Sequence, residues 1–362
     1  MEKVFEGHAH TLMRVPVRES NEIFKKMFCD LGVMKTAFVS CPIHEHGDVD
    51  MDKLQNIKCL YYKGIFSPNA YAYCGLEHDF EMPIDKRAEY YLNQAKENLN
   101  NGYDGYKILE GMPKYIKKLG YGLNHQVFEP FWAYLEEKQV PILIHNAHPK
   151  RFWDSDISDY WKQRGCFYGD GSYPDFYEIV NDIFSVLDRH PNLRITLAHM
   201  GFLENDYDLS IKFMSYKNTM FDLTPGGAFL EYLNGDKRKE WIEFIIKYSD
   251  RIVYGTDLYN FEENADWKRA YHARPDFVRQ CLETDTEHEY AGRKFVGMKL
   301  PKKYRNKIYR ENLIRELGEP KPINFDWAIE KVKELRREFN DLETLDGYDL
   351  ACMENDFSFL KK

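Results

Sequence analysis

Several features are missing from this sequence of 362 residues, and each absence excludes a class of protein. No long uncharged apolar run is present, which argues against a membrane-spanning helix. The net charge is −9, so the basic excess that nucleic-acid phosphates require is absent. The seven cysteines are odd in number and form no Cys-x-x-Cys pair, which is typical of buried thiols in a reducing compartment. No repeat or Gly/Ser linker marks a domain boundary.

The start of the sequence also lacks the basic-then-apolar layout of a signal peptide. Together with the cysteine pattern, this predicts a cytoplasmic protein. Hydrophobic residues make up 43% of the chain and charged residues 30%, which is a globular composition and not a disordered one. We therefore expect an enzyme-sized protein whose partner is a small-molecule substrate, with no nucleic acid and no membrane.

The sequence alternates short apolar β-rich runs with longer amphipathic stretches. Eight runs have the composition of strands: residues 3–7, 33–40, 58–66, 105–109, 140–144, 194–198, 219–223 and 251–254. Helical patterns with apolar residues at three-and-four spacing lie between them, including residues 85–99, 126–138, 177–189 and 237–248. This alternation predicts an α/β fold, a (β/α)8 TIM barrel, which needs roughly 250 residues. An open doubly wound sheet is the alternative, but it usually has a glycine-rich first turn.

Two segments are left over from the eight β/α units. Residues 146–177, an inserted loop after the fifth strand, are rich in aromatic side chains and should lie at the face where loops shape a barrel's pocket. Such a loop suits a lid over a ligand, and it equally suits a subunit contact in a homo-oligomer. The charged residues 325–343 predict a surface helix. We place the barrel at residues 1–318 and a C-terminal helical extension packed on it at residues 319–362.

Four of the predicted strands end in residues that can bind a metal ion. His8 and His10 end the first strand two positions apart, so both imidazoles point to the same side. His145 ends the fifth strand, His199 ends the sixth, and Asp257 follows the eighth. The C-terminal ends of barrel strands meet on one face, so these side chains can converge there. Nitrogen and oxygen ligands with an open position suit a divalent metal such as zinc.

The His-x-His pattern alone is weak evidence, as a second example in the chain shows. His44 and His46 flank Glu45 just beyond the second strand, where we interpret them as part of an exposed polar loop. What favours a metal at the first pair is its position, because several other strand ends carry ligand residues at the same face.

These motifs resemble the amidohydrolase superfamily, and in particular its amidohydrolase 2 branch. The matching stretches occur in the family's order, at residues 5–10, 140–145, 191–201, 250–257 and 308–312. The resemblance implies a distorted (β/α)8 barrel with His8, His10, His145 and Asp257 as metal ligands. It also implies that His199 faces the substrate in single-metal members, or binds the second ion in two-metal members. Asp257 and His199 are therefore the expected catalytic residues.

Lys107, on the fourth predicted strand, separates the two subtypes of this family. Two-metal amidohydrolases bridge their ions through a carboxylated lysine on that strand, whereas a lysine near this place in single-metal members is an ordinary cation. The overall resemblance favours one divalent ion, zinc or alternatively manganese. Lys107 would then bind a substrate carboxylate, and a salt bridge to Glu110 or another local acid is the structural alternative.

Other residues near the strand ends are candidates for substrate contact, with packing inside the loops as the alternative for each. They are His148, Arg151, Trp153, Tyr168, Asp170 and Arg274.

Residues 165–174 resemble a subgroup whose members are mostly called predicted metal-dependent hydrolases. We therefore expect a hydrolase in which metal-activated water cleaves an amide, lactone or other ester bond of a small, carboxylated or cyclic molecule. Asp257 would take the proton of that water, and His199 would orient the water or stabilise the oxyanion. The alternative is a carboxy-lyase or hydratase with the same ligands, because the branch includes both. A non-enzymatic binder should have lost a ligand, and none is missing.

Overall fold

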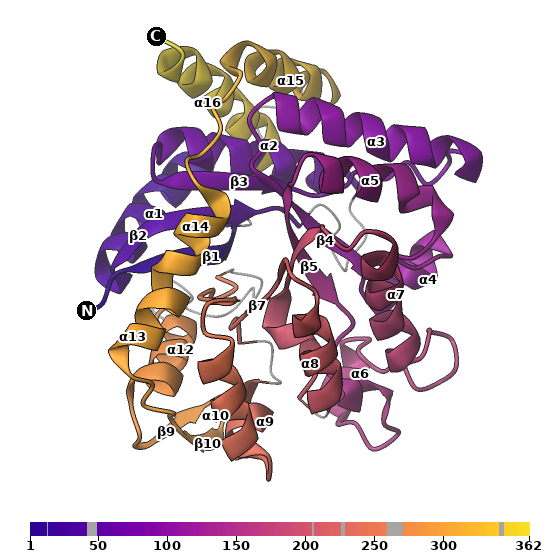
Figure 1. Cartoon of the computed structure of the whole chain (residues 1–362). Helices are drawn as coiled ribbons and strands as arrows, with labels where there is room; N and C mark the ends of the chain where they lie inside the picture. The colour runs from indigo at the N-terminus through magenta and orange to yellow at the C-terminus, as the bar shows by residue number, and fades with distance from the viewer. Residues whose placement is uncertain (13, 42–48, 205, 226–228, 259–270, 340–343) are drawn as a thin grey trace.

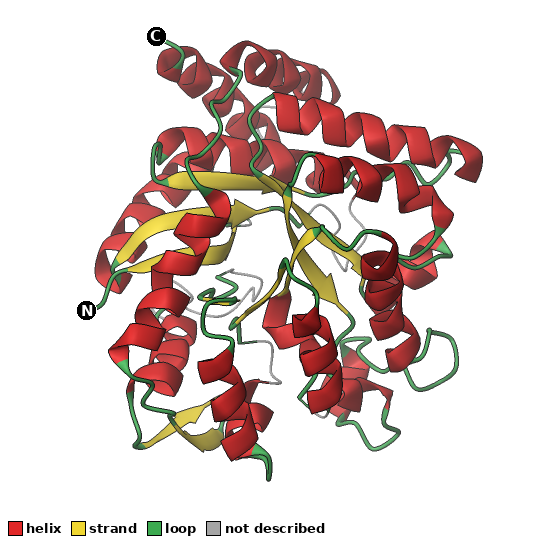
Figure 2. Cartoon of the chain, viewed as in Figure 1, coloured by secondary structure: helices red, strands yellow, loops and turns green. Residues whose placement is uncertain are grey.

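The computed structural model describes residues 1–12, 14–41, 49–204, 206–225, 229–258, 271–339 and 344–362. Its centre is a sheet of eight parallel strands that follow one another in sequence order. Figure 2 shows these strands in yellow, with helices in red around them. The strands are β1 (Val4–His10), β2 (Val33–Val39), β3 (Ala70–Cys74), β4 (Gly105–Gly111), β5 (Pro141–Asn146), β6 (Arg194–Leu197), β7 (Thr219–Asp222) and β8 (Ile252–Val253). Beyond β8, the chain returns to β1, where Gly7 N donates to Tyr254 O and His10 N donates to Leu258 O. The sheet thus nearly closes, and the predicted (β/α)8 barrel is confirmed.

Helices lie around the outside of this barrel (Figure 1). Those along the barrel are α1 (Val17–Leu31), α2 (Val49–Ile65), α3 (Ile84–Asn100), α4 (Pro113–Leu119), α5 (Glu129–Glu137), α7 (Phe176–Arg189), α8 (Tyr207–Ser215), α9 (Phe229–Asn234), α10 (Arg238–Lys247), α12 (Ala273–Glu283), α13 (Lys302–Asn306) and α14 (Asn312–Leu317). Local sequence explains where α7 begins, because Asp175 and Glu178 form a reciprocal capping box there. A short antiparallel hairpin, β9 (Glu287–Tyr290) with β10 (Arg293–Val296), follows α12. In the described part of the chain, no helix is long and apolar enough to cross a membrane.

The predicted third strand at residues 58–66 is wrong, because these residues lie mostly in α2 and the third strand is β3. The cause is burial on every side of the helix. Residues 54–64 are all buried, between the barrel and the C-terminal helices, so no polar face reveals the helical period. Lys63 is tolerated inside because its Nζ lies 2.7 Å from a carboxylate oxygen of Asp104.

The C-terminal segment consists of α15 (Phe325–Glu338) and α16 (Leu345–Leu360), which pack on each other and on α2 (Figure 1). Asp349 of α16 is fully buried. One of its carboxylate oxygens accepts a hydrogen bond from Val17 N at 2.9 Å, which satisfies a free N–H group at the start of α1. The other oxygen lies 2.8 Å from Lys58 Nζ of α2. Buried polar contacts therefore join this segment to the first two helices of the barrel.

The inserted loop after β5 contains two short helices, η2 (Lys150–Trp153) and α6 (Asp159–Gln163). Its apolar side chains form a small cluster of their own, built from Phe152, Ile157, Cys166 and Tyr168, with Trp153, Trp161, Phe167 and Tyr173 packed against it. The loop is therefore an ordered unit held by its own core at the C-terminal end of the barrel.

Candidate metal centre

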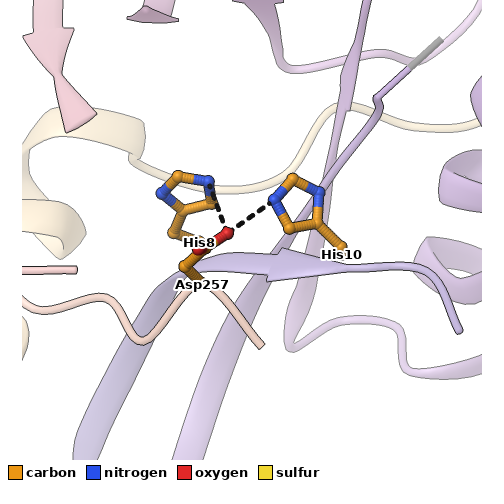
Figure 3. A group of neighbouring side chains, drawn as sticks. All are labelled: His8, His10 and Asp257. Carbon is orange, nitrogen blue, oxygen red and sulfur yellow. Dashed lines mark hydrogen bonds and ion pairs between the residues drawn. The ribbon is translucent and has the colours of Figure 1, made fainter. Parts of the chain in front are cut away.

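Three potential metal ligands meet where β1 lies beside the end of β8. His8, His10 and Asp257 each place one ligand atom within 4.8 Å of the other two (Figure 3). His10 Nε2 lies 2.9 Å from Asp257 Oδ1, and His8 Nε2 lies 3.7 Å from the same oxygen. The two strands come this close because residue 255 is glycine. A Cβ there would lie 3.0 Å from His8 Cβ and 2.8 Å from Thr224 Cγ2.

The contact between His10 and Asp257 calls for a cation. His10 Nδ1 lies 3.1 Å from the carbonyl oxygen of Val39, which can only accept, so the imidazole proton sits on Nδ1. Nε2 of the neutral ring is then a bare acceptor that faces a second acceptor, the Asp257 carboxylate. A proton or a metal ion must lie between them. Although burial opposes the charge, contacts with Cys41 and Asp257 outweigh it and raise the pKa of His10 to about 9.

His145, the fourth expected ligand, lies next to this group but outside the 4.8 Å cluster. Its ring centroid is 4.7 Å from that of His199 and 5.2 Å from that of His148. Its Nε2 atom is buried, and no described residue offers it a hydrogen-bond partner. An unsatisfied buried nitrogen of this kind is a free ligand atom. The donor set and this nitrogen therefore fit a divalent metal.

His199 lies at the end of β6, in the short helix η3 (Ala198–Phe202), and its ring centroid is 5.8 Å from that of His8. The backbone here is unusual, since His199, Met200 and Phe202 all have φ between 50° and 55°. Asp257 has a φ of 52° as well. Left-handed backbone in non-glycine residues is strained, and such strain concentrates at functional sites.

Burial determines the charge of the other imidazoles. It lowers the pKa of His8 to about 3, helped by the Lys107 ammonium, and lowers the pKa of His148 to about 3, helped by Lys114. The pKa of His145 and that of His199 are also lowered, chiefly by burial. These four rings are neutral at pH 7, which is the form that binds a metal.

Lys107 lies directly in this site. It is 1% exposed, and its Nζ lies 3.0 Å from His8 Nε2. The salt bridge to Glu110, the structural alternative, is not formed, because Glu110 pairs with His78 at 2.7 Å instead. Burial lowers the pKa of Lys107.

Only some of the expected substrate-contact residues contact the expected metal ligands. Arg274 binds Asp257, with Nη1 2.6 Å from Oδ2, and this contact helps to hold the pKa of Asp257 well below its usual range against the effect of burial. His148 faces His145 and lies 2.7 Å from the hydroxyl of Tyr168. Trp153 donates to Pro174 O at 2.9 Å and packs inside the inserted loop.

Two further candidates lie farther out. Arg151 lies in η2, and Asp170 is exposed and accepts a hydrogen bond from Ser172 N. The second histidine pair, His44 and His46, lies outside the described residues.

Sequence reasoning missed two buried carboxylates beside the site. Asp222, at the end of β7, lies 2.8 Å from His8 Nδ1. Glu6 accepts hydrogen bonds from His8 N, Thr256 N and Thr256 Oγ1, and burial raises its pKa to about 7. Signals for both were present. Asp222 ends an apolar strand as His145 does, and Glu6 shares a strand face with His8 and His10 by the period of two.

The fold and the site together define a (β/α)8-barrel protein with a candidate metal centre at the C-terminal ends of its strands. Comparison with known proteins agrees with this class. Residues 100–317 match the family model described as amidohydrolase, in the amidohydrolase 2 branch. The chain belongs to this family.

Two gamma-resorcylate decarboxylases, from Rhizobium sp. (strain MTP-10005) and Rhizobium radiobacter, are each 25% identical to the chain over 170 residues. The matched region is 40% of this chain and 48% of each relative, so the chain spans about half the length of the curated relatives it matches.

Solved structures at low identity share the fold. An uncharacterised TIM-barrel protein from Bordetella bronchiseptica has a TM-score of 0.55 at 12% identity, covering 87% of this chain and 98% of its own. For 4-oxalomesaconate hydratase from Rhodopseudomonas palustris the TM-score is 0.53 at 12% identity, with 93% and 100% covered. For 2,6-dihydroxybenzoate decarboxylase in complex with 2,6-dihydroxybenzoate it is 0.50 at 15% identity, with 88% and 99% covered.

Proposed function

We propose that this protein is a metal-dependent carboxy-lyase that acts on a small molecule carrying a carboxylate. The observation that carries the proposal is the buried ammonium of Lys107, whose one hydrogen-bond partner among the described residues is His8 Nε2. A metal bound to that nitrogen would remove this hydrogen bond and leave a buried cation without a partner, which is unfavourable. A substrate carboxylate would restore both the hydrogen bond and the opposite charge.

The relatives support this substrate class. Both curated relatives are decarboxylases by name, and a structure of the same fold was solved with 2,6-dihydroxybenzoate, an aromatic carboxylate. We infer that the substrate of this chain is similarly small, and that it is an aromatic or otherwise conjugated carboxylate.

His8, His10, His145 and Asp257 would hold one divalent ion, zinc or manganese. When bound, that ion would act as a Lewis acid toward a substrate oxygen. Lys107 would hold the carboxylate. His199 would accept a proton at Nε2 from a substrate hydroxyl and return it to the carbon that loses carbon dioxide. The electrons of the broken carbon–carbon bond stay on that carbon, which takes the proton.

Hydrolysis of an amide, lactone or other ester bond is the second candidate. It is favoured by a specific observation: His199 Nδ1 lies 3.3 Å from the carbonyl oxygen of Thr224, which can only accept, so Nε2 of the neutral ring could accept the proton of an attacking water. Asp257, ionised and next to His10, could take the same proton.

The test is a substrate screen with the full chain loaded with Zn²⁺ or Mn²⁺. We expect carbon dioxide release from 2,6-dihydroxybenzoate or a related hydroxybenzoate, and Lys107→Met should lower kcat/KM about 10–100-fold while keeping the metal, because one charge-assisted hydrogen bond is lost. Lys138→Met, at an exposed lysine paired with Glu137, is the control. Lactone or ester hydrolysis without any decarboxylation would overturn the proposal in favour of the second candidate.

A further inference from the structure

One buried carboxylate touches both the candidate metal centre and the candidate catalytic histidine. We propose that Asp222 is a positioning residue with two functions: it holds His8 in the tautomer that binds metal, and together with Thr224 it aims the proton-accepting nitrogen of His199 into the site. The inference rests on the proposed metal centre, and it holds for decarboxylation and for hydrolysis alike.

Each carboxylate oxygen of Asp222 contacts a different histidine. Oδ2 lies 2.8 Å from His8 Nδ1. Oδ1 accepts from His199 N at 2.7 Å, from Thr224 N at 3.1 Å and from Thr224 Oγ1 at 2.5 Å. Asp222 is 2% exposed and Thr224 is fully buried, so water does not compete for these contacts. The two backbone N–H groups can only donate, and although burial opposes it, contacts with His8, His199 and Thr224 lower the pKa of Asp222, so the carboxylate is ionised.

For His8, this contact selects the tautomer. A carboxylate only accepts, so the imidazole proton lies on Nδ1 and Nε2 keeps its lone pair. The opposite side of the ring gives the same result independently. Lys107 Nζ, which only donates, lies 3.0 Å from His8 Nε2. Both neighbours thus prepare Nε2 as a metal ligand.

For His199, Thr224 selects the tautomer. The Thr224 hydroxyl gives its proton to Asp222, so its oxygen accepts from His199 Nδ1 at 2.9 Å. The carbonyl oxygen of Thr224, 3.3 Å from the same nitrogen, can also only accept. Neutral His199 is therefore protonated on Nδ1. It presents a bare Nε2, which takes up a proton before it can give one.

Asp222 also holds the backbone that carries His199. Its bond to His199 N is formed where φ is 55°, a conformation that a histidine rarely adopts. The carboxylate thus fixes the direction of the His199 side chain as well as its tautomer. A buried carboxylate that only needed hydrogen-bond partners would not have to do both.

Asp222→Asn tests this with almost no change in shape. Three donors converge on Oδ1, so the amide oxygen must stay there and the amide NH2 must face His8 Nδ1. A donor at that place favours a His8 proton on Nε2, at the cost of the hydrogen bond from Lys107 to that nitrogen, and a proton there blocks the metal-binding atom. Thr224→Val removes only the hydroxyl that His199 contacts, and Thr224→Ser keeps it, which makes these two variants a matched pair.

The experiment uses the full chain, freed of metal and labelled with ¹⁵N-histidine, followed by titration with Mn²⁺. In the unmodified protein, the NMR spectra should show His8 and His199 protonated on Nδ1. Asp222→Asn should move the His8 proton to Nε2 and weaken Mn²⁺ binding about 10–100-fold. Thr224→Val should shift the His199 signals and leave Mn²⁺ affinity unchanged, and Thr224→Ser should restore those signals.

An Nε2-protonated His8 or His199 in the unmodified metal-free protein would overturn the inference, even if no variant folded. Unchanged His8 signals and unchanged Mn²⁺ affinity in folded Asp222→Asn would overturn it too. If the tautomers are as described but the loaded enzyme decarboxylates nothing, the proposed function fails while the positioning function of Asp222 stands.

Discussion

The histidines at the two ends of the barrel differ in how their ring nitrogens are paired. At the N-terminal end, His190 precedes β6 and lies beside a surface hollow of about 720 Å³. Its Nε2 is 2.8 Å from Glu129 and its Nδ1 is 3.0 Å from Glu136. Both nitrogens have a carboxylate partner, and the pair of ion contacts is complete.

At the C-terminal end, His145 and His10 lack this arrangement. His145 Nε2 has no partner among the described residues, and His10 Nε2 faces another acceptor in Asp257. The backbone at His199 and Asp257 is left-handed. An unsatisfied nitrogen together with strained backbone therefore marks the C-terminal end as the candidate functional end of the barrel.

The largest effect should come from His10→Ala. We expect it to remove most of the bound metal, and turnover with it, while the barrel stays folded, because the variant deletes a ligand and leaves the core in place. Metal analysis after gel filtration, together with circular dichroism, measures both. The unmodified protein should carry about one ion per chain. Full metal occupancy in the variant would show that β1 does not supply the ligands.

His199→Asn should lower turnover about 10²–10³-fold and leave the metal in place, since the group that moves the proton is lost but no ligand is. Asp257→Asn is the contrasting variant and should weaken the metal as well. The measurements are kcat and metal content of the same preparations. If His199→Asn instead lost half of two bound ions, His199 would be a ligand of a second metal.

The affinity for Mn²⁺ should rise with pH up to about 9. Metal binding must displace the proton that His10 holds with a pKa of about 9, so affinity should increase about tenfold per pH unit between pH 7 and 9 and then level off. Calorimetry in buffers of different ionisation enthalpy should find about one proton released per ion. Release of no proton would contradict the contact drawn between His10 and Asp257.

The same shift affects the stability of the metal-free protein. A folded-state pKa above the ordinary 6.5 stabilises the native form fully below pH 6.5, and this contribution is lost as the pH rises toward 9. Urea unfolding of the metal-free chain across this range should show the decline, and His10→Ala should flatten it.

The smallest effect should come from His190→Ala at the opposite end. We expect a loss of about 1–2 kcal/mol in the free energy of unfolding, because two charge-assisted hydrogen bonds disappear but Glu129 is well exposed to solvent. Metal content and turnover should not change. A loss of metal in this variant would erase the contrast between the two ends.

Much of the fold can be predicted from the local pattern of apolar and polar residues in the sequence. Seven of the eight predicted strands overlap observed ones, because an alternation of apolar β runs with amphipathic helices leaves few other arrangements. The failure at α2 has a tertiary cause. Its outer face is covered by α15 and α16, from the far end of the chain, so its burial pattern carries no helical period.

The sequence by itself determined that His8, His10 and Asp257 gather at one site, because a strand has a period of two and parallel strands end on one face. Only the tertiary structure decided what each of them contacts. His8 meets Asp222 across 214 positions of sequence, and His10 meets Asp257 across 247. Tautomer and charge depend on those neighbours, which a local pattern does not contain.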